Sequence, residues 1–468
     1  MKLGANESSS ASRATASRPK VLLLAYSISP VRGSEYAVGW NHVSHLAEFC
    51  DLTVLYGLAG PHMGDLEEIE DHIRTHGDLA NVRFVPIRPN RLARLLNAPN
   101  RAGVLVYTFY LAYRVWHWQA ARIAAKIIAS EQIDLIHYLC PIGYREPSYL
   151  WALSKPLVWG PIGALVPTLQ LKGAPRPWRA VAKVKLKNLA NRLNLALSCR
   201  VRRALRRADT IVAATSENAD MLSTRFAVTP LLIQENAIPD DAVRAHGKLN
   251  GAPDRPARLI WIGSLDWRKS PDLLLDVLAA VRPRDWTLDL IGSGALLALA
   301  QARAAELGLG DRIAFHAQIP RAEVQQLLRE ADLHIITSMG EGNPTTIWEA
   351  MAAGVPTLTL DHCGMHDVVC DVCGVRVTPT DYVGTRDSVA AEIGALIEDR
   401  RKLSALAEGV TICRERFLWS KRSRQWLGIY HGVMARHRHT HGQSCGAAAN
   451  VGWTRGAFRP TGDLANRL

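Results

Sequence analysis

Short apolar runs recur along the chain and alternate with longer stretches that have a helical pattern. Runs such as V-L-L-L-A-Y at residues 21–26 are typical of strands that are buried on both faces of a parallel sheet. The strands predicted in the first half are residues 21–26, 52–56, 82–87, 133–138, 157–159 and 210–214. Those predicted in the second half are residues 258–262, 288–291, 312–315, 333–337, 356–360 and 374–377. This alternation predicts an α/β fold, in which helices cover both faces of parallel sheets.

The two series are separated by G-K-L-N-G-A-P-D-R-P, a segment rich in turn-forming residues that predicts a linker. The chain is also too long for one ordinary core. We therefore predict two doubly wound, Rossmann-like domains. The predicted division is a disordered leader at 1–18, a first domain at 19–246, a linker at 247–257, a second domain at 258–415, a C-terminal helix at 416–436 and a flexible tail at 437–468.

The composition is that of a globular protein, with 48% hydrophobic and 21% charged residues. The 56 basic residues outnumber the 43 acidic ones and give a formal charge of +13. This charge favours an anionic partner, which could be a nucleotide, a phosphorylated lipid, a membrane surface or a nucleic acid. The eight cysteines are scattered through a long chain that shows no signal-peptide pattern, which favours a reduced, cytoplasmic setting.

Residues 337–361 predict a strand end, a tight loop, a short helix and another strand. Asn343 suits the N-cap of this helix, Pro344 its first turn and Gly354 its C-terminus, so we predict a helix over 344–353. Such a corner, at the carboxyl end of a strand in an open parallel sheet, is a common place for a ligand.

The first turn of this helix leaves backbone N–H groups unpaired, so Thr345 and Thr346 can present donors to an anion such as a diphosphate. Glu341 lies in the preceding loop, and Glu349 follows about two helical turns later. The two carboxylates can therefore contact a sugar hydroxyl and a ribose, with phosphates between them. Glutamates are also ordinary at a helix start or on a solvated face, so the spacing alone leaves both interpretations open.

The string E-G-N-P-T-T-I-W-E, followed by A-M-A-A-G-V-P, resembles the E-x7-E motif of retaining family 4 glycosyltransferases of the GT-B fold. The resemblance extends over residues 20–430. It implies an N-terminal acceptor domain and a C-terminal nucleotide-sugar domain facing a central cleft, with a final helix that crosses back to the first domain. It also implies that Glu341 contacts hydroxyls of the donor sugar and Glu349 the ribose, with Asn343, Thr345 and Thr346 among the donor-binding residues.

Two adjacent cations, Arg268 and Lys269, follow a predicted strand in W-I-G-S-L-D-W-R-K-S. A cationic pair suits a diphosphate, because charge-assisted contacts stabilise a departing nucleoside diphosphate. The segment resembles the family's G-x-L-x-x-x-K-G loop, with Gly263 as its first glycine and Ser270 in place of its last. The resemblance assigns the diphosphate to Lys269, with Arg268 beside it.

Two glycine turns follow other predicted strands and are further candidates for donor binding. Gly33 and Ser34 lie in G-S-E-Y-A-V-G-W, which resembles the loop after the first strand in bacterial polysaccharide transferases. Gly292 and Gly294 form I-G-S-G, which resembles the family's loop beside the nucleotide. Glycine lets the backbone approach a phosphate or sugar closely, but a plain strand-to-helix turn gives the same pattern.

His137 ends a predicted strand of the first domain, where we expect it to face the cleft and take a catalytic role. A lone histidine is also common as a packed core residue. Tyr144 and Arg145 follow in a neighbouring loop, where they could bind acceptor hydroxyls or phosphates.

Residues 173–207 form a basic amphipathic segment that could lie on an anionic membrane. An ordinary solvated face over an apolar stripe explains the pattern equally well. Residues 104–120 are apolar and aromatic but too short to span a bilayer, and they predict a buried or interfacial helix. Nucleic acid is not an expected partner, because the basic segment lacks interleaved aromatic residues and no zinc-finger or helix-turn-helix signature accompanies it.

Four residues in H-C-G-M-H-D-V-V-C-D-V-C have spacings that could hold zinc: His362, His366, Cys370 and Cys373. The Cys-x-x-Cys pair could instead be redox active. Because the segment coincides with the family's loop beside the donor sugar, we expect no metal and no cofactor.

The predicted function is metal-independent, retaining transfer of a sugar from a nucleoside-diphosphate donor. The expected acceptor is lipid-linked or a polysaccharide, in cell-surface or exopolysaccharide biosynthesis. We expect the protein in the cytoplasm, with a peripheral position on the inner face of the plasma membrane as a further prediction. The alternatives are a GT-B nucleotide-sugar hydrolase or epimerase, and a non-catalytic nucleotide-sugar binding protein.

Overall fold

The structure is a computed structural model that describes residues 18–33, 35–57, 66–77, 79–105, 108–244 and 255–447. Most of the predicted leader and linker, Ser34, and the predicted tail beyond Ala447 lie outside the described residues.

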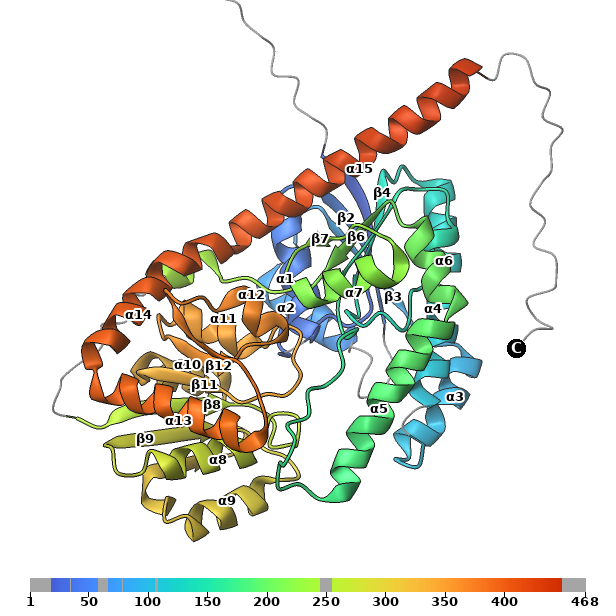
Figure 1. The fold of residues 1–468 in the computed structure, drawn as a ribbon. Coiled ribbons are helices and arrows are strands. Elements are labelled where there is room, and N and C mark those ends of the chain that lie inside the picture. The colour runs from blue at the N-terminus through green and yellow to red at the C-terminus, as the bar shows by residue number, and fades with distance from the viewer. Residues whose placement is uncertain are drawn as a thin grey trace, which may run out of the picture.

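The first half of the chain forms a seven-stranded parallel sheet with the order β3-β2-β1-β4-β5-β6-β7 (Figure 1). Its strands are β1 (Lys20–Ala25), β2 (Asp51–Gly57), β3 (Val82–Ile87), β4 (Leu135–Cys140), β5 (Leu157–Ile162), β6 (Thr210–Ala213) and β7 (Leu231–Leu232). Six of the seven were predicted, and the two-residue β7 was not.

The second half forms a six-stranded parallel sheet with the order β10-β9-β8-β11-β12-β13. Its strands are β8 (Ala257–Ile262), β9 (Trp286–Ile291), β10 (Ile313–His316), β11 (Leu333–Ile336), β12 (Thr357–Leu360) and β13 (Gly374–Val377). All six correspond to predicted strands, so the predicted architecture of two Rossmann-like parallel sheets is confirmed.

Helices connect the strands in both halves. Those of the first half are α1 (Glu35–Leu46), α2 (Leu66–His76), α3 (Arg91–Arg101), α4 (Phe109–Ser130), α5 (Trp178–Leu197), α6 (Cys199–Arg207) and α7 (Ser216–Phe226). Those of the second half are α8 (Pro271–Ala280), α9 (Leu297–Glu306), α10 (Arg321–Glu330), α11 (Thr345–Ala352), α12 (Cys363–Val368), α13 (Tyr382–Glu398), α14 (Arg400–Arg414) and α15 (Trp419–Ala447).

Strand β1 shows why helices cover both faces of the first sheet. Leu22 and Leu24 pack with Trp116 of α4, whereas Leu23 packs with Val43 of α1 on the opposite face. All these side chains are fully buried. Since successive side chains of a strand point to opposite faces, an uninterrupted apolar strand needs a cover on each side.

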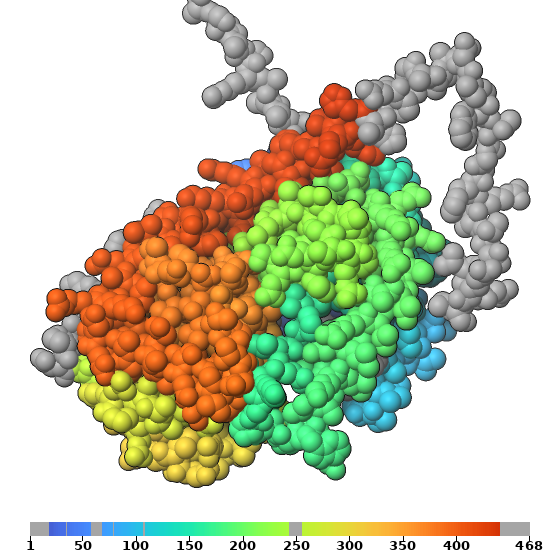
Figure 2. Space-filling view, in the orientation of Figure 1, coloured from blue at the N-terminus to red at the C-terminus, as the bar shows by residue number. Residues whose placement is uncertain are grey.

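The final helix returns to the first half of the chain. The chain crosses where Ile238 bridges Leu418, and Trp426 and Tyr430 of α15 then enter the core beside β1 and α1. Figure 2 shows α15, in red, running along the edge of both halves. A final helix that crosses back was expected from the family resemblance, and the structure contains one.

The bounds of this last helix differ from the prediction of a helix over 416–436 followed by a flexible tail. Residues 415–417 form a 3-10 turn, and α15 continues to Ala447. Glycine and serine in the last segment suggested a loose chain. However, once a helix is nucleated and packed, each added residue gains a hydrogen bond without a new nucleation cost.

Candidate functional site

A cleft of about 1620 Å³ lies between the two sheets. It is bordered by the loops that follow β1, β4, β5, β8 and β11, and by the first turns of α1 and α11. These loops stand at the carboxyl ends of parallel strands, where doubly wound sheets bind their ligands. The lining includes the predicted residues Gly33, Arg145, Gly263, Arg268, Lys269, Glu341, Asn343, Thr345, Thr346 and Glu349.

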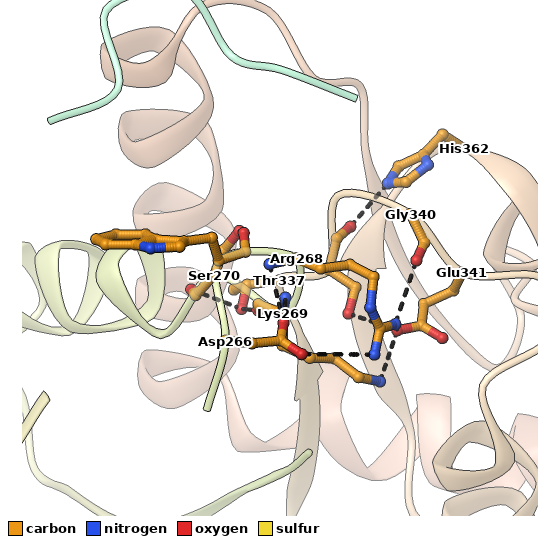
Figure 3. Close-up of polar contacts among 10 residues, drawn as sticks. Asp266, Arg268, Lys269, Ser270, Thr337, Gly340, Glu341 and His362 are labelled. Atoms are coloured by element: carbon orange, nitrogen blue, oxygen red, sulfur yellow. Dashed lines mark hydrogen bonds and ion pairs between the residues drawn. The ribbon is translucent and has the colours of Figure 1, made fainter. Parts of the chain in front are cut away.

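The loop after β8 brings two cations to one carboxylate. Asp266 Oδ1 accepts hydrogen bonds from the backbone N–H groups of Arg268 (2.9 Å) and Lys269 (3.0 Å), which fixes the turn. Lys269 Nζ lies 2.7 Å from Glu341 Oε1, and Arg268 forms a second ion pair with the same carboxylate (Figure 3). Ser338 Oγ donates to Glu341 Oε1 at 3.1 Å.

The Lys269–Glu341 pair is largely removed from solvent, since each side chain is only 12% exposed. An ion pair at this depth is stronger than one on the surface, because water screens it less. The sequence did not predict this contact between Glu341 and the cationic loop. A bound diphosphate would have to share these cations with Glu341.

Gly292 and Gly294 support this loop from behind rather than line the cleft. Both have positive φ, 143° and 156°. A Cβ at Gly292 would lie 1.9 Å from Gly263 O, and one at Gly294 would lie 2.5 Å from Leu265 O. Their glycine character serves close packing against the turn at 263–265, and their contact with the donor stays a prediction.

The N-terminus of α11 differs from the prediction in one respect that matters for binding. Its N-cap residue is Pro344, which offers no side-chain hydrogen bond, and the helix begins at Thr345. Asn343 does not cap the helix, because its Nδ2 donates to Ala214 O (3.0 Å) and to Glu235 Oε2 (2.5 Å). The first turn of α11 therefore faces the cleft without a side-chain cap, as an anion site requires.

Glu349 lies in the second turn of α11 and reaches the same cleft. Its Oε1 is 3.3 Å from Arg321 Nη2, at the start of α10. Burial raises the pKa of Glu349, and Arg321 partly counters this effect. The structure thus brings Glu341, Lys269 and Glu349 together around the start of one helix, as the sequence predicted.

The predicted acceptor residues separate in the structure. Arg145 lines the cleft, and its Nη1 donates to Tyr110 Oη at 3.2 Å. Tyr144 is buried beneath the loop, and its hydroxyl donates to Asn191 O at 3.1 Å. Only Arg145 of this pair is placed to meet a ligand.

His137 is not at the cleft, which corrects its predicted catalytic position. Strand β4 extends to Cys140, so His137 lies within the strand and is fully buried. One ring nitrogen is 2.7 Å from Tyr430 Oη and the other is 2.8 Å from Gly160 O. Burial lowers the pKa of His137 to about 4, so the ring is neutral at physiological pH. It joins α15 to the first sheet.

Two acidic residues that sequence reasoning missed also line the cleft. Glu35 begins α1, and its Oε1 accepts from the Ile142 backbone N–H at 2.8 Å. Glu235 lies after β7 and accepts from Asn343. Burial raises the pKa of both carboxyl groups, that of Glu235 to about 7. Glu35 adjoins the glycine turn and could have been found there, whereas nothing in the local sequence marks Glu235.

Of the four residues considered for zinc, the two histidines do not join the two cysteines. His362 Nε2 lies 2.8 Å from Ser338 O, beside the Glu341 loop (Figure 3). His366 Nδ1 lies 2.7 Å from Asp361 Oδ1. The structure instead places Cys413 next to Cys370 and Cys373.

The basic segment forms α5 and α6, and much of its apolar surface is exposed. Trp178 and Leu197, at the two ends of α5, are 74% and 73% exposed. Other exposed residues on α5 include Leu186, Leu189 and Leu193, and basic residues such as Lys183, Lys185 and Arg192. Within the described ranges, no helix combines the length and apolar character needed to cross a bilayer. Leu195 is buried, but most leucines of α5 are exposed instead of forming the buried stripe of an ordinary surface helix.

Known proteins match the second half of the chain most directly. The family described as "Glycosyl transferases group 1" matches residues 245–410. A D-inositol 3-phosphate glycosyltransferase of Salinispora tropica is 28% identical over 49% of this chain and 52% of its own length. A D-inositol 3-phosphate glycosyltransferase of Catenulispora acidiphila is 28% identical over 75% of this chain and 81% of its own length. The chain spans about half the length of the first curated relatives that it matches.

A solved structure of Anabaena HepE in complex with UDP and glucose shares the fold. Its TM-score is 0.57 at 18% identity, and the match covers 89% of this chain and 100% of that chain. At this identity the likeness shows the fold, which is the GT-B arrangement of two Rossmann-like domains.

Proposed function

We propose that the protein is a retaining glycosyltransferase that takes a sugar from a nucleoside-diphosphate donor and transfers it to a lipid-linked or polysaccharide acceptor. The main support is that Arg268, Lys269 and Glu341 converge beside the start of α11, which has no side-chain cap. The family match over residues 245–410 supports this assignment, because it includes all of these residues.

In the proposed complex, the diphosphate lies between the first turn of α11 and the cations of the β8 loop. Backbone N–H groups at Thr345 and Thr346 and the Lys269 ammonium donate to phosphate oxygens. Negative charge grows on the leaving phosphate as the bond to the sugar breaks. These fixed donors therefore stabilise the transition state more than the bound donor, which is what accelerates transfer.

The two carboxylates hold the ends of the donor in this proposal. Glu341 already has the cationic loop on one side and accepts hydrogen bonds from sugar hydroxyls on the other. Glu349 accepts from the ribose, about two helical turns along α11. UDP is the first nucleotide to test, since the structural neighbour HepE is described in complex with UDP and glucose.

The acceptor would enter from the first domain, where Arg145 lines the cleft. Arg145 suits a phosphate or a sugar hydroxyl, because its guanidinium carries fixed donors and a permanent charge. The D-inositol 3-phosphate glycosyltransferases named above fit an acceptor that carries a phosphate. A lipid diphosphate or a growing polysaccharide in cell-surface synthesis offers the same chemistry.

We further propose that α5 and α6 hold the protein on an anionic membrane, at the cytoplasmic face of the plasma membrane. Exposed leucines flanked by lysines and arginines suit an interface, where apolar side chains enter the bilayer and cations meet acidic headgroups. This position would bring the cleft close to a lipid-linked acceptor.

The decisive experiment is thermal unfolding of the full chain with UDP, GDP, ADP and CMP, followed by transfer assays with the matching sugar nucleotides. A ligand at a hundred times its dissociation constant stabilises the fold by about 2.7 kcal/mol. The proposal expects one nucleotide to raise the midpoint and its sugar nucleotide to support transfer with the α or β configuration retained, as read by NMR. Free sugar without acceptor would indicate a hydrolase, an epimeric sugar nucleotide an epimerase, and binding without turnover a binding protein.

A further inference from the structure

Three cysteines meet on the side of the second domain behind α11. Cys370 and Cys373 lie in the turn between α12 and β13, and Cys413 is in the last turn of α14. The Cys370 sulfur is 3.5 Å from that of Cys373 and 3.4 Å from that of Cys413. All three sulfurs lie within 4.8 Å of one another. Segments separated by some forty residues thus converge on one point.

The sulfur spacing matches what a metal ion requires. A tetrahedral zinc site has Zn–S distances of about 2.3 Å, which places its sulfurs about 3.8 Å apart. The two shorter distances here fall within about 0.4 Å of that value, so a small outward movement would admit an ion. A trigonal arrangement around a smaller, softer ion needs a similar separation.

Two hydrogen-bond donors contact the cysteine sulfurs. The Cys370 backbone N–H donates to Cys373 Sγ at 3.4 Å, and Arg416 Nη2 donates to Cys413 Sγ at 3.6 Å. Three thiolates and a divalent ion carry a net charge of −1, which the Arg416 guanidinium can offset. Donors of this kind orient metal-binding thiolates and stabilise their charge.

The cluster also has an entry path. Cys373 and Cys413 are 2% and 4% exposed, whereas Cys370 is partly open to solvent. The adjacent Val372 is 54% exposed, so the turn itself is at the surface. An ion could therefore arrive from the Cys370 side and keep a water molecule at the position that no sulfur fills.

We propose that Cys370, Cys373 and Cys413 bind one soft metal ion, Zn²⁺ or Cu⁺, through three sulfur atoms. Thiolates favour both ions over Mg²⁺ or Ca²⁺, which prefer oxygen ligands. Binding displaces the thiol protons to solvent and involves no oxidation, so it needs no further reactant.

The site is structural rather than part of the sugar-transfer chemistry. Its cysteines share an apolar cluster with Trp348 and Met351, on the back of α11. The same cluster contains Ile238 and Leu418, where the chain crosses between domains. A bound ion would tie α14 and the α12–β13 turn together beneath the helix that carries Glu349.

The test is metal titration of the full chain, purified with a reductant and freed of metal by a chelator. Co²⁺ serves as the first probe, because a thiolate-to-cobalt charge-transfer band reports sulfur ligation. Competition with a coloured chelator then gives the affinities for Zn²⁺ and Cu⁺. We expect one ion per chain and a higher unfolding midpoint on loading, independent of nucleotide binding.

Cys413→Ser should weaken binding by more than about a hundredfold, since removal of mere supporting contacts in metal sites costs tenfold to a hundredfold. Cys370→Ser provides a second test at a more exposed position, in case the buried substitution impairs folding. The matched controls are Cys199→Ser, an exposed cysteine on α6, and His366→Ala, and both should bind as the wild type does.

Three results would overturn the proposal. The first is no metal uptake by a protein whose thiols are all reduced. The second is unchanged affinity in Cys413→Ser together with loss of binding in His366→Ala. The third is a Cys370–Cys373 disulfide, detected by mass spectrometry, that forms readily in air and is not prevented by added Zn²⁺.

Discussion

The two walls of the cleft treat their acidic residues differently. On the wall of the second domain, each acid faces a cation: Glu341 pairs with Lys269 and Arg268, and Glu349 with Arg321. On the first-domain side, Glu146 pairs with Arg200 and Arg114. The hydrogen bonds that the described residues give to Glu35 and Glu235, by contrast, come from neutral N–H groups.

The second-domain wall thus pairs its acids with cations, whereas the first-domain wall also contains carboxyl groups that accept only from neutral donors. A cation beside a buried carboxylate offsets part of the cost of losing water. Burial is the largest influence on Glu235, and it raises the pKa of this carboxyl group to about 7. The second-domain wall therefore suits a charged diphosphate, whereas the first-domain wall can offer neutral carboxyl groups to hydroxyls.

The largest effect is expected when a cation is removed from the second-domain wall of the cleft. We expect Lys269→Ala to lower the transfer rate by about a hundredfold to a thousandfold, the usual cost of losing one donor that stabilises developing charge. The measurement is kcat with saturating sugar nucleotide. Lys402→Ala, which removes an exposed lysine near the end of the second domain, is the control and should be active. Wild-type turnover in both Lys269→Ala and Glu341→Ala would refute the site.

The substitution Glu235→Gln tests the raised pKa of Glu235 on the first-domain wall. Because the pKa of about 7 in the folded protein lies above the ordinary value of 4.5, the folded state holds a proton that the unfolded state has lost between these pH values. Wild-type stability should therefore fall relative to the variant as pH rises from about 4.5 to about 7, by up to about 3 kcal/mol, and level off above that range.

The measurement for Glu235→Gln is urea unfolding of both proteins at pH 5.5, 6.5, 7.5 and 8.5. The glutamine keeps an acceptor for Asn343 and cannot ionise, so it isolates the titration. The groups near Glu235 that also carry charge are Glu35 and Arg422, and both remain in the variant. A wild-type advantage that grows with pH would show that Glu235 is ionised in the folded protein.

The outer side of the first-domain wall provides a third test, because α5 lines the cleft with Lys187 and also exposes leucines. Leu189→Asp combined with Leu193→Asp should weaken binding to anionic vesicles by at least about tenfold, since burying one leucine contributes about 1.5–3 kcal/mol. Flotation with phosphatidylglycerol vesicles measures this. Leu299→Asp, an exposed leucine on α9, is the control. A wild-type protein that does not float would refute the membrane surface.

The smallest effect on turnover is expected for His137→Gln. The histidine bridges Tyr430 and Gly160 in the core, so its loss should destabilise the fold by about 1–3 kcal/mol and leave kcat within about twofold. Thermal unfolding measures the difference in stability. The values of kcat are compared at a temperature where both proteins are folded. A large loss of kcat with unchanged stability would instead show that His137 takes part in catalysis.

The second-domain wall of the cleft was predictable because most of its functional residues are close together in the sequence. Glu341, Thr345 and Glu349 belong to one loop and one helix, and helical geometry fixes their relative positions. Lys269 was found through its own short motif, and the rule that parallel strands present their carboxyl ends at one edge brought it to the same place.

The other wall was harder to predict because strand ends decide which residues reach a cleft. A strand predicted at 133–138 placed His137 at its end, but β4 extends to Cys140 and keeps the histidine inside the sheet. On the second-domain wall, Asn343 was predicted as a cap from local preference, but its side chain donates to Glu235, which is distant in the sequence. Local patterns cannot show such distant partners.

The sequence by itself determined two parallel sheets, the alternation of helices around them and the residues of the charged corner, since each follows from local periodicity or a short motif. The tertiary structure alone decided which carboxyl groups are paired, which have a raised pKa, and that Cys413 joins Cys370 and Cys373. Burial and long-range contact set these properties, and both arise only when segments far apart in the chain pack against each other.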